Sequence, residues 1–159
     1  MQIVHKACPC VLRKNKDGIE ILVFKHPFAG WQIPKGTVEA GEALEVSTLR
    51  ELAEESGITS ASIIKKVGTL ERHRGSGPQE DGPMECHIWH LFILKPEQTL
   101  PEQWDHMAEG SEIESGLTFS FFWCPLDLTH QEHFDPVFVR VLDQLKMYLK
   151  QHPELLDAL

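Results

Sequence analysis

The sequence has few cysteines, no excess of positive charge and no long apolar run, and each absence argues against a class of protein. Its cysteines, Cys8, Cys10, Cys86 and Cys124, do not form the two matched pairs typical of a structural zinc site. With 15 basic and 24 acidic residues the net charge is −9, which argues against binding long nucleic acid through its phosphates. No apolar run approaches the roughly 18 residues of a membrane span, so we expect no membrane partner.

A zinc site around Cys86 is the one alternative that the cysteines leave open. His87 and His90 stand close to it, but they are three apart in a segment typical of a strand, so they would face opposite sides. The nine histidines show no other metal-ligand spacing. We therefore expect the cysteines to be small apolar residues in the strands of a reduced, cytoplasmic protein.

Length and composition indicate a single domain. A chain of 159 residues with 42% hydrophobic residues suits one domain over residues 1–159. Internal repeats and low-complexity segments are absent, and residues 1–13 lack the long apolar core of a signal peptide. The expectation is a cytoplasmic enzyme whose oligomeric state is open.

Hydrophobic alternation predicts a sheet. The predicted strands cover residues 3–13, 19–26, 63–73, 86–95 and 117–124. An Asn-Lys-Asp-Gly turn joins the first two into a hairpin. The polar, glycine-rich residues 74–83 are either a mobile substrate lid or an ordinary hairpin connection.

Two helices accompany these strands. One is predicted over residues 43–56, and the other begins after Asp135, with Pro136 in its first turn and an apolar stripe over residues 138–149. Strands mixed with two helices predict an α/β (α+β) fold in which helices cover a sheet.

The first helix is the most informative segment because it carries three carboxylates on one face. Glu51, Glu54 and Glu55 project within roughly 100° of arc, and like charges at this spacing repel. Such a face is either solvated or a site for a hard cation such as Mg²⁺ or Mn²⁺, which prefers oxygen ligands.

The other side of this helix predicts how it is anchored. Val46, Leu49, Leu52 and Ala53 form an apolar stripe at about 100° to 220° from Glu51. We expect this stripe to pack on the core, so that the carboxylates point outward from a rigid support. The helix is expected to end at Gly57 in a left-handed cap.

The segment around this helix resembles the signature of the Nudix hydrolase family. That signature runs Gly, five residues, Glu, seven residues, Arg-Glu, an aliphatic residue, any residue, Glu-Glu, any residue, Gly and an aliphatic residue. Every position is filled, by Gly36, Glu42, Arg50, Glu51, Leu52, Glu54, Glu55, Gly57 and Ile58. The resemblance implies one Nudix hydrolase domain, an αβα sandwich with a mixed sheet.

The resemblance also implies roles for the matching residues. The implied ligands of a divalent cation, Mg²⁺ or Mn²⁺, are Gly36 through its carbonyl, Glu42, Glu51, Glu54 and Glu55. Glu54 is also a candidate to activate the attacking water. Arg50 would orient the carboxylates rather than bind metal.

In some members of this family a glutamate from a late loop is the general base. Glu109, Glu112 and Glu114 lie just before the last predicted strand. Each also fits ordinary loop solvation, and Glu112 is our single choice because it lies in the middle of the loop.

The substrate is less clearly marked. The Pro-Lys-Gly triplet that ends at Gly36 resembles that of dinucleoside polyphosphate hydrolases, in which Lys35 would reach a polyphosphate oxygen. A solvent-facing lysine at a turn is an equal alternative. A tyrosine that marks those hydrolases beyond the signature is absent, since His73 and Arg74 stand there and the only tyrosine is Tyr148.

Aromatic side chains offer stacking surfaces for a base. The candidates are Trp89, Trp104, Phe121 and Trp123. Alternation along residues 87–92 places Trp89 on one face of a strand, and we expect it to pack in the core.

The resulting hypothesis is a metal-dependent pyrophosphohydrolase that cleaves a nucleoside diphosphate linked to another group, with a dinucleoside polyphosphate as one candidate. The alternative is a non-catalytic nucleotide-ligand sensor, which could have lost a carboxylate, whereas this sequence keeps all of them. Hydrolysis of capped RNA ends would use the same chemistry, but the acidic balance disfavours long RNA.

Overall fold

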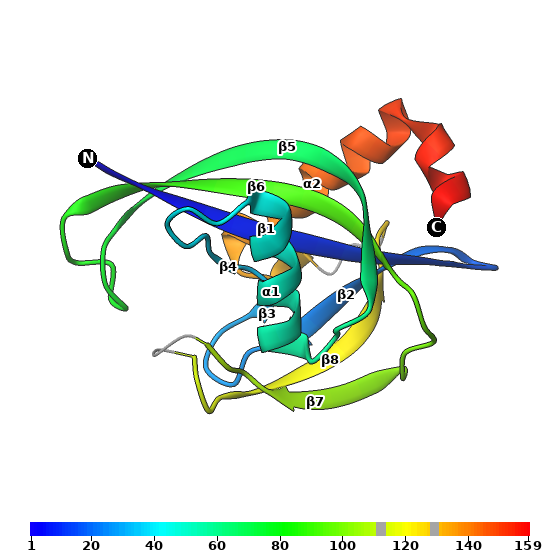
Figure 1. The fold of residues 1–159 in the computed structure, drawn as a ribbon, viewed down its shortest axis with the longest axis horizontal. Helices are drawn as coiled ribbons and strands as arrows, with labels where there is room; N and C mark the ends of the chain where they lie inside the picture. Colours follow the sequence, from blue (N-terminus) through cyan, green and yellow to red (C-terminus); the bar gives the residue numbers. More distant parts are fainter. Residues whose placement is uncertain (111–113, 128–130) are drawn as a thin grey trace.

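The structure is a computed structural model that describes residues 1–110, 114–127 and 131–159. Its strands are β1 (Gln2–Asn15), β2 (Gly18–Lys25), β3 (Trp31–Gln32), β4 (Gly36–Thr37), β5 (Ala61–Gly75), β6 (Met84–Pro96), β7 (Gln103–Met107) and β8 (Thr118–Pro125). Its helices are α1 (Leu44–Ser56), α2 (Pro136–Gln151) and the short 3₁₀ segments η1 (Gln131–His133) and η2 (Pro153–Ala158). Figure 1 shows α1 crossing in front of the strands and α2 lying behind β5 and β6.

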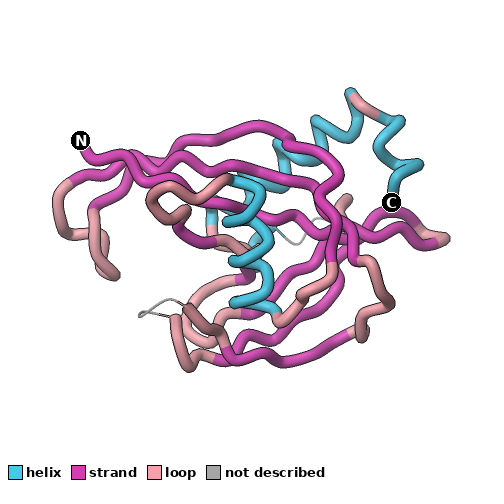
Figure 2. The backbone as a smooth tube through the Cα atoms, in the orientation of Figure 1, coloured by secondary structure: helices cyan, strands magenta, loops and turns pink. Residues whose placement is uncertain are grey.

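The strands form one mixed sheet in the order β5-β6-β1-β2-β8-β7, with β3 attached to β2 and β4 attached to β1. Strand β1 joins the two halves: residues 2–11 pair in parallel with β6, and residues 12–15 pair antiparallel with β2. Figure 2 shows how few helical segments accompany these strands.

Each face of the sheet packs on one helix, because neighbouring residues of a strand point to opposite faces. Cys10 of β1 lies in a buried cluster with Leu145 of α2, whereas Val11 lies in a second buried cluster with Leu52 of α1. The predicted α/β (α+β) class with a mixed sheet is therefore confirmed. Among the described residues, no helix is long and apolar enough to cross a membrane.

The predicted strands and helices all appear within a few residues of their expected ends, but the two-residue strands β3 and β4 and the longer strand β7 were not predicted. The last of these, β7, is the most extensive. It is an edge strand of sequence QWDHM whose side chains are exposed or half-buried. Edge strands bury few side chains and therefore show little apolar alternation. Its Trp104 lies opposite Phe121 of β8, with the rings stacked at 5.2 Å.

The predicted apolar anchor of α1 is confirmed at Leu52 and wrong at Val46 and Leu49. Val46 is 57% exposed and Leu49 is 40% exposed, while Leu52 is 1% exposed. The buried side consists of Ser47, Thr48, Glu51, Leu52, Glu55 and Ser56. Short hydroxyl side chains let the helix approach the sheet closely.

Hydrogen bonding within the helix makes this polar contact face possible. The Thr48 hydroxyl donates to the Leu44 carbonyl, and the Ser56 hydroxyl donates to the Leu52 carbonyl. Because these buried hydroxyls are satisfied inside the helix, they need no partner on the sheet. Glu51 and Glu55 lie on this same side of the helix, so their carboxylates point inward and not to solvent.

This orientation predicts unequal costs for two leucine truncations on the same helix. Leu52→Ala should lower the free energy of unfolding by about 2–5 kcal/mol, because it leaves a cavity under α1. Leu49→Ala should change it by about 0.5 kcal/mol or less, because that side chain is largely outside. Urea denaturation measures both, and a larger cost for Leu49→Ala would restore the apolar stripe as the anchor.

Candidate active site

The carboxylates of helix α1 lie against Lys35, which precedes β4, and against Gly36, the first residue of β4. A Cβ placed on Gly36 would lie 1.9 Å from Cδ of Glu51. The Lys35 backbone N–H donates to Glu55 Oε2 at 3.2 Å. A side chain at position 36 would displace the Glu51 carboxylate from the space that it occupies here.

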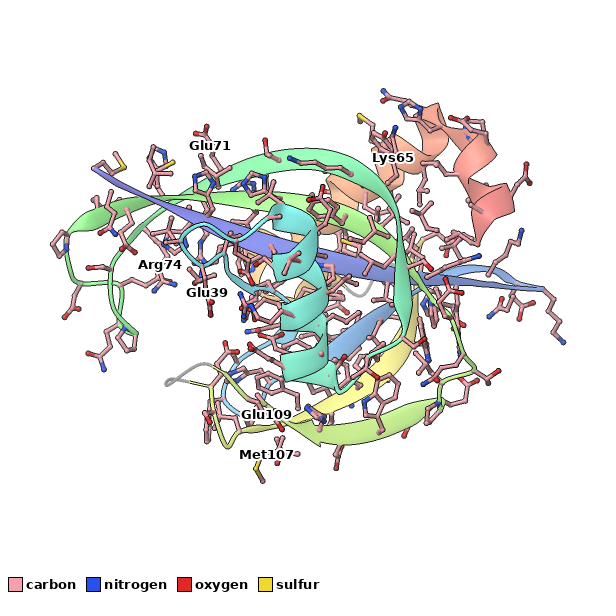
Figure 3. The ribbon with its side chains drawn as sticks, viewed as in Figure 1. Glu39, Lys65, Glu71, Arg74, Met107 and Glu109 are labelled. Atoms are coloured by element: carbon pink, nitrogen blue, oxygen red, sulfur yellow. The ribbon has the colours of Figure 1, made fainter. Side chains whose placement is uncertain are left out.

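The loop after β7 lies against Glu54. The Glu109 N–H donates to the Glu54 backbone carbonyl at 3.1 Å. A Cβ on Gly110, whose φ is +84°, would lie 2.2 Å from Glu54 Oε2. Figure 3 shows Glu109 at the C-terminal end of α1, where this loop meets the helix.

Arg50 contacts most of the acidic residues of the signature. Its Nε donates to Glu42 Oε2 at 2.7 Å, and its Nη1 donates to Glu51 Oε1 at 2.8 Å and to Glu54 Oε2 at 3.1 Å. Its Nη2 donates to the Thr37 carbonyl at 3.0 Å, which ties α1 to β4. This geometry fixes the carboxylate rotamers, as expected of an orienting residue.

The pKa values of Glu42 and Glu51 shift in opposite directions in this arrangement. The hydrogen bond from Arg50 lowers the pKa of Glu42 to about 2. Burial raises the pKa of Glu51 above its usual value, and the hydrogen bond from Arg50 offsets only part of that shift. The ionised form is therefore harder to maintain at Glu51 than at Glu42.

Lys35 does not face solvent. Its side chain is 16% exposed, and Nζ lies 2.9 Å from Glu114 Oε1 and 3.7 Å from Glu55 Oε1. Burial lowers the pKa of Lys35, but the two carboxylates outweigh burial and raise it overall. Burial raises the pKa of Glu55 well above normal. At Glu114 burial also raises the pKa, but Lys35, Glu55 and His26 together outweigh burial and lower it overall.

Of the three late-loop glutamates, Glu109 and Glu114 are described by the structure. Glu112 lies outside the described residues. Glu114 is brought against Lys35 and Glu55, and Glu109 contributes its backbone to Glu54. Sequence reasoning considered Glu114 but could not rank it first, because its partners come from distant segments.

The cleft beside α1 has a volume of about 980 Å³, and its lining includes Lys35, Glu55, Glu109 and Glu114. Besides Lys35 and Arg50, cationic side chains in its lining come from β1, β5 and α2: Lys6, Arg72, Arg74 and Arg140. Sequence analysis did not propose these four residues. Strand alternation could have paired Arg72 with Arg74 on one face, but it could not indicate that this face lines the cleft.

The loop between β5 and β6 borders the same cleft. Arg72 Nη2 donates to Glu80 Oε1 at 3.0 Å, and Arg74 Nη2 donates to the Gly77 carbonyl at 2.7 Å. Glu80 has a φ of 57°, a conformation unusual for a residue other than glycine. Residues 74–83 therefore contain a hairpin connection between two paired strands, and two of the arginines that line the cleft hold it there; a lid motion stays a prediction.

The aromatic candidates for base stacking are engaged in packing. Trp89 is 2% exposed and meets Phe138 edge-on, as expected for a core residue. The Trp104 indole N–H donates to the Ser56 carbonyl, and the Trp123 indole N–H donates to the Pro101 carbonyl.

The carboxylate site fits a hard divalent cation. Glu51 and Glu55 are 8% and 3% exposed, so their oxygens are largely removed from water, and Gly36 leaves room for a close approach. The donors are oxygens, which suits Mg²⁺ or Mn²⁺ rather than a soft metal. Gly36, Glu42, Glu51, Glu54 and Glu55 remain the predicted ligands.

The fold and this acidic helix beside a cleft together define a class of protein. Residues 4–145 match the NUDIX domain, so the chain belongs to the Nudix family. The predicted resemblance is therefore confirmed over most of the length, well beyond the signature itself.

Similar proteins are found among sequences and structures. An RNA pyrophosphohydrolase of Caulobacter vibrioides is 53% identical over 66 residues, which is 40% of this chain and 38% of that protein. An RNA pyrophosphohydrolase of Wolbachia sp. subsp. Brugia malayi is 37% identical over 116 residues, 68% of this chain and 55% of that protein. A binary complex of Caenorhabditis elegans Ap4A hydrolase has a TM-score of 0.62 at 20% identity, covering 93% of this chain and 98% of that one.

Arg50→Lys tests whether the guanidinium holds the carboxylates for a metal. Lysine keeps the charge but cannot contact Glu42, Glu51 and Glu54 together, so Mn²⁺ binding should weaken by about 10- to 100-fold. Mn²⁺ titration followed by electron paramagnetic resonance measures the affinity. Arg13→Lys, which alters an arginine paired with Glu20 outside the cleft lining, is the matched control and should bind like the wild type. Equal affinities for all three proteins would contradict the role of Arg50.

Proposed function

We propose that this chain is a divalent-metal-dependent pyrophosphohydrolase that cleaves a nucleoside diphosphate linked to another group, with Mg²⁺ or Mn²⁺ as its metal. The observation that carries the proposal is the convergence of Glu51 and Glu55 with Gly36 and Lys35 at one cleft. Cleavage of a phosphoanhydride requires neutralisation of phosphate charge and a positioned water. The carboxylate ligands on α1, together with Arg50 on the same helix and Lys35 just before β4, meet both requirements.

The chain's own residues have separable roles in this proposal. A bound cation supplies charge neutralisation and makes a water a stronger nucleophile. Glu54 accepts the proton of that water, while Arg50 keeps Glu51 and Glu54 in fixed rotamers. Lys35 contacts a substrate phosphate, whose oxygen then replaces one of its carboxylate partners.

A late-loop glutamate is the alternative to Glu54 as the proton acceptor, and Glu112 stays our single choice among the late-loop residues. Its neighbour Glu114 is the weaker candidate because Lys35 lowers its pKa, and a carboxylate with a depressed pKa is a poorer proton acceptor. Glu112→Gln and Glu114→Gln, compared in the same assay, would separate the two.

Two substrate classes deserve a direct comparison. Dinucleoside polyphosphates are favoured by the Pro-Lys-Gly triplet and by the position of Lys35 at the cleft. The 5′ ends of RNA are favoured by the names of the relatives and by Lys6, Arg72 and Arg74, which place cationic groups among the carboxylates of the cleft lining. The alternative of a non-catalytic sensor is disfavoured because every signature carboxylate is present.

Glu54→Gln should lower turnover by about 10²- to 10⁴-fold, because it removes the proton acceptor while keeping the side-chain volume. Glu45→Gln, on the exposed side of the same helix, is the matched control and should retain full activity. Thermal melting of both variants reports folding. Full Mg²⁺-dependent turnover by Glu54→Gln would remove that residue from the mechanism.

Phosphate release across a substrate panel tests the function itself. The panel holds dinucleoside polyphosphates, ADP-ribose, nucleotide sugars, nucleoside triphosphates and RNA with a 5′-triphosphate, each in Mg²⁺ and in Mn²⁺, with and without a coupled phosphatase. We expect metal-dependent turnover, with the highest kcat/KM for one of the two proposed classes. Nucleotide binding without turnover of any compound would establish the sensor instead.

A further inference from the structure

Three side chains that commonly bind metals lie together on β5 and β6. His73 is directly opposite Cys86 in the strand register, and Glu71 precedes His73 by two residues on the same face. One ligand atom from each residue lies within 4.8 Å of the others, and His73 Nε2 is 3.9 Å from Glu71 Oε2. We propose that Glu71, His73 and Cys86 form a binding site for a transition-metal ion of the zinc class.

This site is separate from the acidic helix. Residues of β5 alternate between faces, so Arg72 and Arg74, which line the cleft, point away from the face that carries Glu71 and His73. Figure 3 shows Glu71 on the outer side of β5 and Arg74 on the side of Glu39. A metal held by the trio therefore does not enter the cleft.

The donor set selects the metal. A thiolate sulfur and an imidazole nitrogen bind Zn²⁺ or Co²⁺ in preference to Mg²⁺, which takes oxygen ligands. Three protein ligands leave one tetrahedral position for water. The chain would then hold two kinds of metal at two sites: a hard cation at α1 and a softer one on the outer face of β5 and β6.

Local geometry allows the ligands to close on an ion. The pairing of β5 with β6 is regular here, since its register shifts lie between residues 63 and 68. The side chains of Glu71 and His73 are 66% and 52% exposed and Cys86 is half-buried, so rotamer changes meet little resistance. Zn–S and Zn–N bonds of about 2.0–2.3 Å need only a modest contraction of the observed separations.

Sequence spacing could not reveal this site. Cys86 has neighbours in sequence, His87 and His90, but His87 points to the cleft side of the same strand. The residue that meets Cys86 is His73, which the antiparallel register places across from it. A metal here would link β5 to β6 at the base of the loop that carries Glu80.

The test uses Co²⁺ as a spectroscopic probe on the full chain in excess Mg²⁺. We expect one Co²⁺ per chain, with tetrahedral d–d bands and a thiolate charge-transfer band, both lost when Zn²⁺ is added. Cys86→Ser should remove the charge-transfer band, and His73→Ala should weaken binding at least about tenfold, since even loss of an outer partner costs about 10–100-fold. Cys124→Ser and Glu54→Gln are the controls and should bind like the wild type.

Several outcomes would overturn the assignment. Absence of the charge-transfer band in the wild type, or its survival in Cys86→Ser, would exclude Cys86 as a ligand. Loss of binding in Glu54→Gln but not in His73→Ala would place the ion at the acidic helix. Loss in His5→Ala but not in His73→Ala would give the nitrogen ligand to His5, which lies on the neighbouring strand opposite Ile88. Circular dichroism of each variant checks that the fold is kept.

Discussion

Burial of negative charge is the constraint on which the rest of this molecule depends. Glu51 and Glu55 are 8% and 3% exposed, and ionised carboxylates in such places are costly unless cations and hydrogen-bond donors surround them. Arg50 and Lys35 offset part of that cost from two sides, one from the same helix and one from the segment before it. The spacing of the signature can be understood as the spacing that brings these opposite charges together.

The second requirement is that the carboxylates of α1 come close to the backbone of neighbouring segments. Glycine at position 36 lets one carboxylate rest on the backbone, and glycine at position 110 does the same for Glu54. A helix that contacts the sheet through hydroxyls rather than large apolar groups can come near enough for this to happen. Packing, charge and backbone conformation are therefore coupled at one end of α1, so that a change in any of them alters the others.

Much of this arrangement was predictable from the sequence, and the failures have two causes. Strands, helices and the acidic triad follow from periodicity and spacing, which depend on residues close in the chain. The buried side of α1 was misjudged because counting apolar residues ignores hydroxyls satisfied within the helix, as at Thr48 and Ser56. The partners of Lys35, the cleft position of Arg72 and the edge strand β7 depend on pairing between distant segments, which one sequence does not specify.

The parallel pairing of β1 with β6 has a consequence for how the chain acquires its structure. Gln2 pairs with Glu85, so the strand that joins both halves of the sheet cannot complete its contacts until most of the chain is present. Long-range parallel contacts of this kind carry a large loop-closure cost and slow the search for the native topology. Before β6 and β8 are synthesised, β1 and β2 can pair as a hairpin with the short strands β4 and β3 attached, and the edges that later pair with β6 and β8 stay open to other chains. Strand β1, which joins the two halves of the finished sheet, is thus a strand whose edge is covered late.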